Sequence, residues 1–240
     1  MPLPKISHPT YEVYLKSLDR KVKFRPFLVK EEKLLLMAKE GDEVNEIVKT
    51  VKQIISNCLL EDINVDELPT FDIEMFFINL RIRSVGEAAD MVYTCDNTLE
   101  DNTTCGQKIE FSLDLNKVVY ESAPGHNAII KLNDKIGLKF NYPSLDFDSD
   151  QLSDTLEDGG YKFVSHYLDY IYDDEEIHKR KDFSDEELKE FFDQLSIDHV
   201  VAIRKFFETT PKVVLKQDIT CSKCGHVHNL NVEGLLNFFD

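Results

Sequence analysis

The chain has 240 residues, 42% hydrophobic and 30% charged, so it can bury a substantial core in one or two domains. Its net charge of −17 argues against a nucleic-acid-binding protein and against binding to anionic membranes, because both need basic surface. The sequence has no apolar run of roughly 18 residues and no signal-peptide core near Met1, so we expect a folded, soluble cytoplasmic protein. The acidic surface either serves solubility or meets a basic partner.

The first third of the chain predicts a β-hairpin followed by helices. Apolar residues alternate in 11–15 and again in 22–27, and residues 16–21 supply a polar turn. Helical spacing of apolar residues follows in three segments, 30–39, 44–60 and 71–84. Cys58 lies on the apolar face of the second helix, where we expect a small buried side chain rather than a reactive thiol.

The remainder alternates between predicted strands and predicted helix. Residues 160–209 are expected to be helical, with a capping box at Ser184–Glu187 and a further cap at Ser196. Strands are expected on both sides of this block, at 91–95, 108–115, 128–132, 136–140, 212–220 and 226–232.

Two cysteine-containing segments resemble each other and indicate an internal repeat. Each enters as Thr-Cys, leaves through Cys-Gly and continues as a strand that ends near an acidic residue. In the first segment Cys95 and Cys105 are separated by nine residues, and in the second Cys221 and Cys224 by two. In both, a glycine directly after the second cysteine suits the tight backbone of a metal-binding turn.

These four cysteines predict a structural zinc site. Zn²⁺ binds four ligands tetrahedrally, so neither half of the repeat could complete the site alone, whereas Cys95, Cys105, Cys221 and Cys224 together could. Free thiols and a redox role are the alternatives, and His226 and His228 are substitute ligands if Cys95 or Cys105 does not reach the metal. Four protein ligands leave no position for water, so the site would be structural rather than hydrolytic.

Other motifs are weaker. Asp146, Asp148, Asp150 and Glu157 match four positions of a calcium-binding EF-hand loop, but Gln151 stands where the glycine belongs, which favours a solvated acidic loop. The sequence contains no phosphate-binding loop, dinucleotide-binding glycine pattern or nucleophile elbow. We therefore expect no enzyme.

The segments combine into an α+β fold in which a split zinc ribbon joins the middle of the chain to its end. We expect residues 1–90 to form a hairpin with helices, and residues 91–120 and 212–240 to form the ribbon with a C-terminal segment. Residues 121–211 would be a mixed insertion, mainly helical in its second half.

Several blocks resemble the baseplate hub and hub-assembly proteins of T-even-like contractile-tailed phages. They include Val22–Met37, Leu68–Glu74, Leu80–Gly86 and the ending from Cys221 to Phe239. The resemblance implies a structural or assembly protein that binds other baseplate hub proteins, made in the host cytoplasm and destined for the tail baseplate or its assembly. The alternative is a zinc-ribbon regulatory adaptor that binds a polymerase or another basic protein.

Two interpretations remain for the region that contains the stretch Phe24-Arg25-Pro26-Phe27 and the apolar run Leu34–Met37. An amphipathic helix needs only about half of such a run to face one core. Either the chain itself buries the rest, or this region docks another hub protein with Arg25 and Phe27 as anchors.

Overall fold

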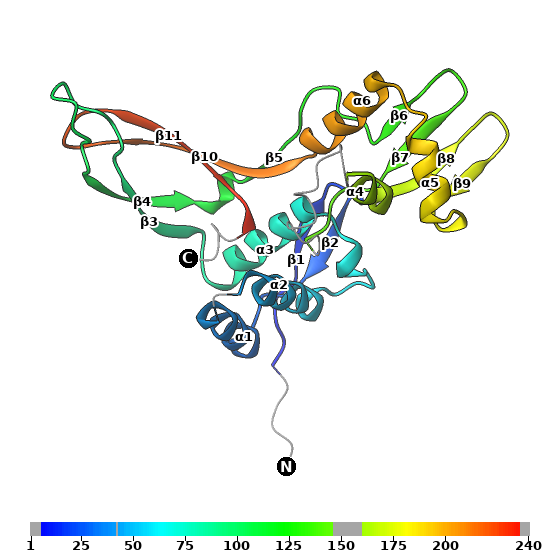
Figure 1. Ribbon diagram of the computed structural model, residues 1–240. Helices are drawn as coiled ribbons and strands as arrows, with labels where there is room; N and C mark the ends of the chain where they lie inside the picture. The colour runs from blue at the N-terminus through cyan, green and yellow to red at the C-terminus, as the bar shows by residue number, and fades with distance from the viewer. Residues whose placement is uncertain (1–5, 42, 146–159, 236–240) are drawn as a thin grey trace, which may run out of the picture. The chain divides into compact units, whose positions relative to one another are not determined.

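The computed structural model describes residues 6–41, 43–145 and 160–235, and its backbone combines helices with small antiparallel sheets in an α+β arrangement. It divides into two compact units, one of residues 1–121 with 212–240 and one of residues 122–211. Figure 1 shows the elements of each unit in chain order. The calcium-loop pattern at 146–157 lies outside the described residues.

The first unit begins with the hairpin that the alternating pattern predicts. Strands β1 (Tyr11–Leu15) and β2 (Arg20–Phe24) pair antiparallel, with Val13 opposite Val22. Four alternate side chains point inward and are at most 4% exposed: Val13, Leu15, Val22 and Phe24. This two-residue period is the reason that the segment forms a sheet with one buried face.

Three helices follow, as predicted: α1 (Val29–Glu40), α2 (Val44–Cys58) and α3 (Thr70–Ser84). Helix α3 is apolar around most of its circumference and lies in the core, as such a helix must. Its fully buried side chains include Phe71, Ile73, Phe76, Phe77, Ile78 and Leu80. The Phe76 ring packs against that of Phe24, with centroids 5.2 Å apart. Cys58 is fully buried at the end of α2, and burial raises the pKa of its thiol to about 11, as expected of an inert cysteine.

A buried carboxylate links α3 to two distant segments. Asp72 accepts hydrogen bonds from the backbone N–H groups of Lys16 and Ser17, each at 2.9 Å, and from the Tyr120 hydroxyl at 2.7 Å. These donors satisfy a charge that would otherwise be costly in the core. The turn of the hairpin is therefore fixed to α3 and to the strand that carries Tyr120.

The rest of the first unit consists of two antiparallel ribbons. Strands β3 (Ala88–Thr94) and β4 (Lys108–Asp114) form one sheet, and β11 (Val227–Glu233), β10 (Lys212–Thr220) and β5 (Val119–Glu121) form the other in that order. Figure 1 shows both hairpins running out to the same tip. Short 3₁₀ turns lie at Val65–Glu67 and Leu115–Lys117.

The second unit surrounds a four-stranded antiparallel sheet in the order β6 (Ile129–Lys131), β7 (Gly137–Phe140), β8 (Leu168–Tyr172) and β9 (Ile177–Lys179). Helices α4 (Gly160–Tyr167), α5 (Asp185–Phe192) and α6 (Ile197–Glu208) belong to the same unit, with a 3₁₀ turn at Arg180–Asp182. Leu138, Phe140, Ile171, Ile203 and Phe206 are among its core residues. The predicted caps at Ser184 and Ser196 are confirmed.

The expectation of helix throughout 160–209 is wrong in part. Residues 168–172 and 177–179 are strands, because Leu168–Tyr172 pairs with β7 and so continues the sheet. Long-range strand pairing here overrides a local pattern that suits either state. Strand β5, which pairs with β10, was also not expected.

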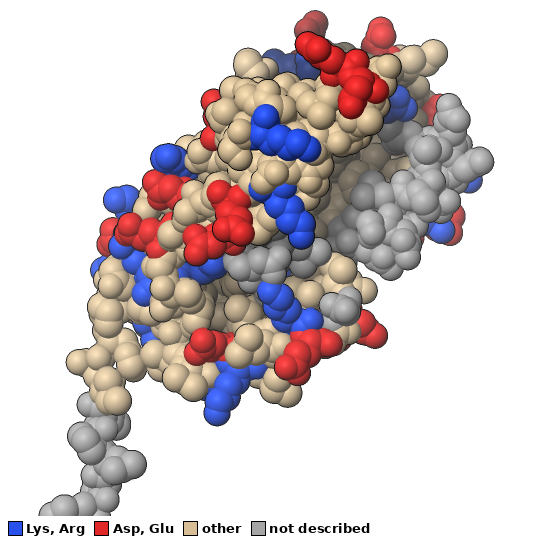
Figure 2. All heavy atoms as spheres, turned by 90° about the vertical axis from the view of Figure 1, so that its left-hand side faces the viewer, with Lys and Arg blue, Asp and Glu red and all other residues tan. Residues whose placement is uncertain are grey.

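Charged side chains of both signs share the surface. Figure 2 shows Lys and Arg interspersed with Asp and Glu over the face that it draws. Along the chain the balance is less even, since residues 122–211 contain 20 acidic and 10 basic residues. Within the described residues, no helix has the length and apolar character that crossing a bilayer requires.

Candidate metal centre

The first half of the cysteine repeat closes around its long insert. Cys95 directly follows β3, and its backbone N–H donates to Gln107 O at 2.8 Å. The insert folds back on itself through a bridge between Thr98 and Thr104, with Asn102 in the left-handed region at φ 62°. Nine intervening residues therefore separate two cysteines that remain neighbours in space.

The second half has the same backbone arrangement with a shorter turn. The Cys221 N–H donates to His226 O at 2.9 Å, the counterpart of the bond from Cys95 to Gln107. In each half the glycine after the second cysteine donates to the first cysteine's carbonyl, from Gly106 at 3.0 Å and from Gly225 at 2.9 Å. Both glycines have positive φ, 64° and 71°, which explains why glycine occupies these positions.

The two halves bring four sulfur atoms together. The Sγ atoms of Cys95 and Cys224 are 3.7 Å apart, those of Cys105 and Cys221 are 3.8 Å apart, and all four lie within 4.8 Å of one another. A tetrahedral zinc ion with Zn–S bonds of ~2.3 Å places its sulfur ligands ~3.8 Å apart. The cluster therefore has the donor type, the number of donors and the spacing that Zn²⁺ prefers.

The sulfur atoms differ in their surroundings. Cys95, Cys105 and Cys221 are at most 4% exposed, and Cys224 is partly exposed. Burial raises the pKa of the Cys95 thiol, whereas the backbone N–H of His226 lowers the pKa of Cys224. Cys224 therefore marks the accessible side of the cluster.

Side chains around the sulfurs supply further contacts. His228 Nε2 lies 3.2 Å from Cys95 Sγ, Asn97 Nδ2 lies 3.6 Å from Cys224 Sγ, and Lys223 Nζ donates to Cys105 O at 3.0 Å. Since Cys95 and Cys105 both reach the cluster, the condition under which His226 or His228 would replace them as ligands does not arise. From the sequence, His228 was expected to be a polar residue on the strand's face or a substitute ligand, and its contact with Cys95 was not predicted.

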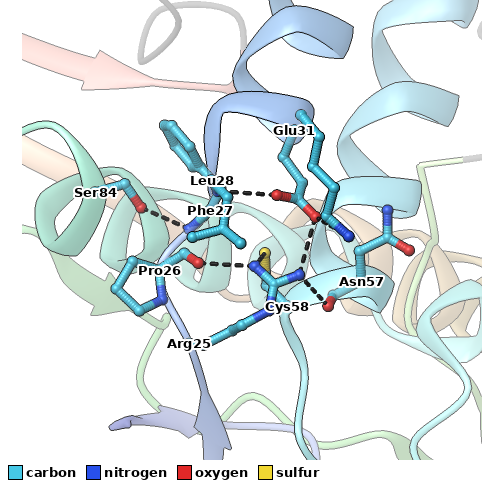
Figure 3. Close-up of polar contacts among 9 residues, drawn as sticks. Arg25, Pro26, Phe27, Leu28, Glu31, Asn57, Cys58 and Ser84 are labelled. Atoms are coloured by element: carbon cyan, nitrogen blue, oxygen red, sulfur yellow. Dashed lines mark hydrogen bonds and ion pairs between the residues drawn. The ribbon is translucent and has the colours of Figure 1, made fainter. Parts of the chain in front are cut away.

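The other stretch that the sequence singles out, around Arg25, forms an internal polar cluster (Figure 3). The Arg25 guanidinium donates to Pro26 O, Asn57 O and Glu31 Oε1, each at 2.9 Å, and lies 3.5 Å from Cys58 Sγ. Glu31 is fully buried and also accepts from the Leu28 N–H at 2.9 Å, which caps the start of α1. Burial alone would raise the pKa of Glu31, but the hydrogen bonds from Arg25 and Leu28 outweigh it, so that the pKa is lowered.

The hydrogen-bond donors of Arg25 are therefore used within its own chain. The exposed apolar residues of α1 are not part of this polar cluster. Phe27 is partly buried, and its backbone N–H donates to Ser84 Oγ at 3.0 Å. Val29, Leu36 and Met37 are 65%, 57% and 69% exposed. They share the side of α1 opposite Glu31.

Comparison with known proteins shows the family to which the chain belongs. The model of a protein family described as "T4 bacteriophage base plate protein" matches residues 8–240, so the chain belongs to this family. The chain is also similar to the baseplate hub assembly protein gp26 of Enterobacteria phage T4, with 28% identity over 217 residues, which cover 90% of this chain and 91% of the relative. No solved structure matches the chain.

Proposed function

We propose that this protein takes part in assembling the baseplate hub of a contractile phage tail, through contacts with other hub proteins and without catalysing a reaction. The observation that carries the proposal is the similarity to a hub assembly protein along nine tenths of both chains. Such a protein is made in the host cell and acts where the tail baseplate is built.

We also infer that Cys95, Cys105, Cys221 and Cys224 bind one structural Zn²⁺. The support is the spacing of their sulfurs, which is 3.7 and 3.8 Å in two pairs across the repeat and at most 4.8 Å in every pair. These pairs join residues 129 and 116 positions apart, so the metal would link the middle of the chain to its end. When bound, Zn²⁺ would stabilise the folded ribbon, whose apolar cluster around the cysteines is small.

We infer three structural parts along the chain. Residues 1–90 would form the helical part with its hairpin, residues 91–120 and 212–240 the zinc ribbon, and residues 121–211 an insertion between the ribbon's halves. For the contacts with another hub protein, the exposed outer side of α1 is the candidate surface. Its apolar residues Val29, Leu36 and Met37 add nothing to the core, and helices that are apolar on both sides are normally covered.

A second candidate function, a zinc-ribbon adaptor for a basic protein, is favoured by one observation. The insertion has twice as many acidic as basic residues, as a surface that binds a basic partner would.

Deletion of the gene in the phage separates the two functions. The assembly role predicts that infected cells contain no complete baseplates while phage transcription proceeds normally. Normal baseplates with altered transcription would instead support the adaptor and contradict the assembly role. Complementation with the wild-type gene is the control.

A further inference from the structure

His228 is a polar residue at a position where the ribbon otherwise places apolar side chains. On β11 it shares the inward side with Leu230 and Val232, and it is only 6% exposed. In the cysteine repeat, Leu230 corresponds to Phe111, so that His228 corresponds to Ile109 of the other half. A buried imidazole in place of an isoleucine needs a hydrogen-bond partner.

The partner is a cysteine of the opposite half of the repeat. His228 Nε2 lies 3.2 Å from Cys95 Sγ. A metal-bound thiolate has no proton, so the nitrogen must donate. The Tyr93 ring lies 4.9 Å from the imidazole, and Asp96 Oδ1 lies 3.4 Å from Nδ1, so contacts on several sides orient the ring.

A second donor crosses between the halves in the opposite direction. Asn97, which belongs to the first half, directs its side-chain amide at Cys224 Sγ, 3.6 Å away. Each half of the repeat therefore contributes one side-chain N–H to a sulfur of the other. Backbone N–H groups also reach two of the sulfurs, from Asn97 to Cys95 and from His226 to Cys224.

Such donors matter because of the charge of the centre. Four thiolates around a divalent cation leave about two excess negative charges, and three of these sulfurs are buried. Burying that charge is costly unless hydrogen bonds compensate for it. Loss of an outer-shell hydrogen bond typically weakens metal binding by about 10- to 100-fold.

We propose that His228 is a positioning residue of the metal centre, whose Nε2–H donates to the Cys95 thiolate across the two halves and so retains the bound metal. The inference rests on the proposed zinc site. It assigns His228 a place outside the ligand set, with four sulfurs and no nitrogen on the metal.

The test compares full-length His228→Phe, His228→Gln and wild type, with His8→Phe as the matched control. His8 is exposed and lies before β1, outside the ribbon. Zinc is removed by competition with a chromophoric chelator, and Co²⁺ replaces zinc for absorption spectroscopy. We expect His228→Phe to bind zinc about 10- to 100-fold more weakly. His228→Gln, which keeps an N–H at similar reach, and His8→Phe should stay near wild type, and Co²⁺ should show four-thiolate spectra throughout.

Four results would overturn the proposal. Equal zinc affinity of His228→Phe and wild type would show that the hydrogen bond does not retain the metal, while leaving the zinc site itself intact. A Co²⁺ spectrum with a nitrogen ligand that disappears in His228→Phe would make His228 a ligand. Equal weakening in His228→Gln and His228→Phe would show that ring packing, not donation, is responsible. A wild type that binds neither metal would remove the zinc site and this inference together.

Discussion

Arg25 Nη2 donates to Glu31 Oε1 over 2.9 Å, and this ion pair joins the segment that follows β2 to the first turn of α1. The two side chains are 15% and 0% exposed. The pair uses the arginine that, from sequence, was one of two candidate anchors for a partner protein. Its position favours the alternative, burial within the chain.

Replacing Arg25 with Ala is therefore expected to destabilise the isolated protein. Removing one partner of a buried ion pair costs up to about 3–5 kcal/mol in the free energy of unfolding, and the remaining partners of Glu31, the Lys30 ammonium at 3.3 Å and the Leu28 N–H, reduce that cost. Urea denaturation monitored by circular dichroism measures the change. The double variant Arg25→Met/Glu31→Leu is the control and should recover much of the loss, because neither charge remains. An Arg25→Ala protein as stable as wild type would contradict this role.

The exposed side of α1 should behave in the opposite way. Leu36→Ser with Met37→Ser removes two side chains that are 57% and 69% exposed, so the melting temperature should stay within a few degrees of wild type. Co-purification with hub proteins from infected cells should fall several-fold. Ile197→Ser, at a residue 82% exposed in the second unit, is the matched control. Equal losses for both proteins would argue against a specific surface on α1.

Glu74 predicts a pH dependence. This α3 residue is 6% exposed, burial raises its pKa to about 7, and the Leu235 N–H partly counteracts the rise. Because the folded-state pKa lies above the unfolded value of 4.5, the protonated carboxyl favours the folded state. Its contribution is fully present below pH 4.5 and is lost as the pH rises through about 7, by about 3 kcal/mol.

The measurement is the difference in unfolding free energy between Glu74→Gln and wild type from pH 5 to pH 8. Protonation of the cysteines weakens metal binding as the pH falls in both proteins, so the difference isolates Glu74. The variant should gain relative to wild type as the pH rises. A difference that is constant with pH would contradict the raised pKa.

Metal removal should unfold the ribbon. Binding of Zn²⁺ by four thiolates contributes free energy on the order of 10 kcal/mol at neutral pH. Chelation, or Cys224→Ser, should therefore lower the melting temperature sharply and increase proteolysis within residues 91–120 and 212–235. Cys58→Ser is the control, because Cys58 lies at the end of α2 and not among the four sulfurs. An unchanged melting temperature after confirmed metal removal would exclude a structural metal.

Local sequence patterns predicted the hairpin, whose two strands are close in the chain, from the alternation in residues 11–15 and 22–27. One long-range contact was also predicted: the repeated Cys-Gly turns indicated that Cys95 and Cys105 would lie near Cys221 and Cys224. Strand β8 was missed because its pairing with β7 is a long-range contact that the apolar spacing of 168–172 does not reveal. The role of Arg25 was equally hidden, since its acceptor on Asn57 lies 32 residues away. Alternation along β11 does place His228 inward, and this signal could have identified its buried contact.

The most direct test of the account is the zinc content of freshly purified protein, measured by elemental analysis together with titration of accessible thiols. We expect one Zn²⁺ per chain in wild type, with thiols that react only after chelation. In Cys224→Ser the metal should be lost or much more weakly held. Wild-type protein without zinc, whose four ribbon thiols react at once, would contradict the account.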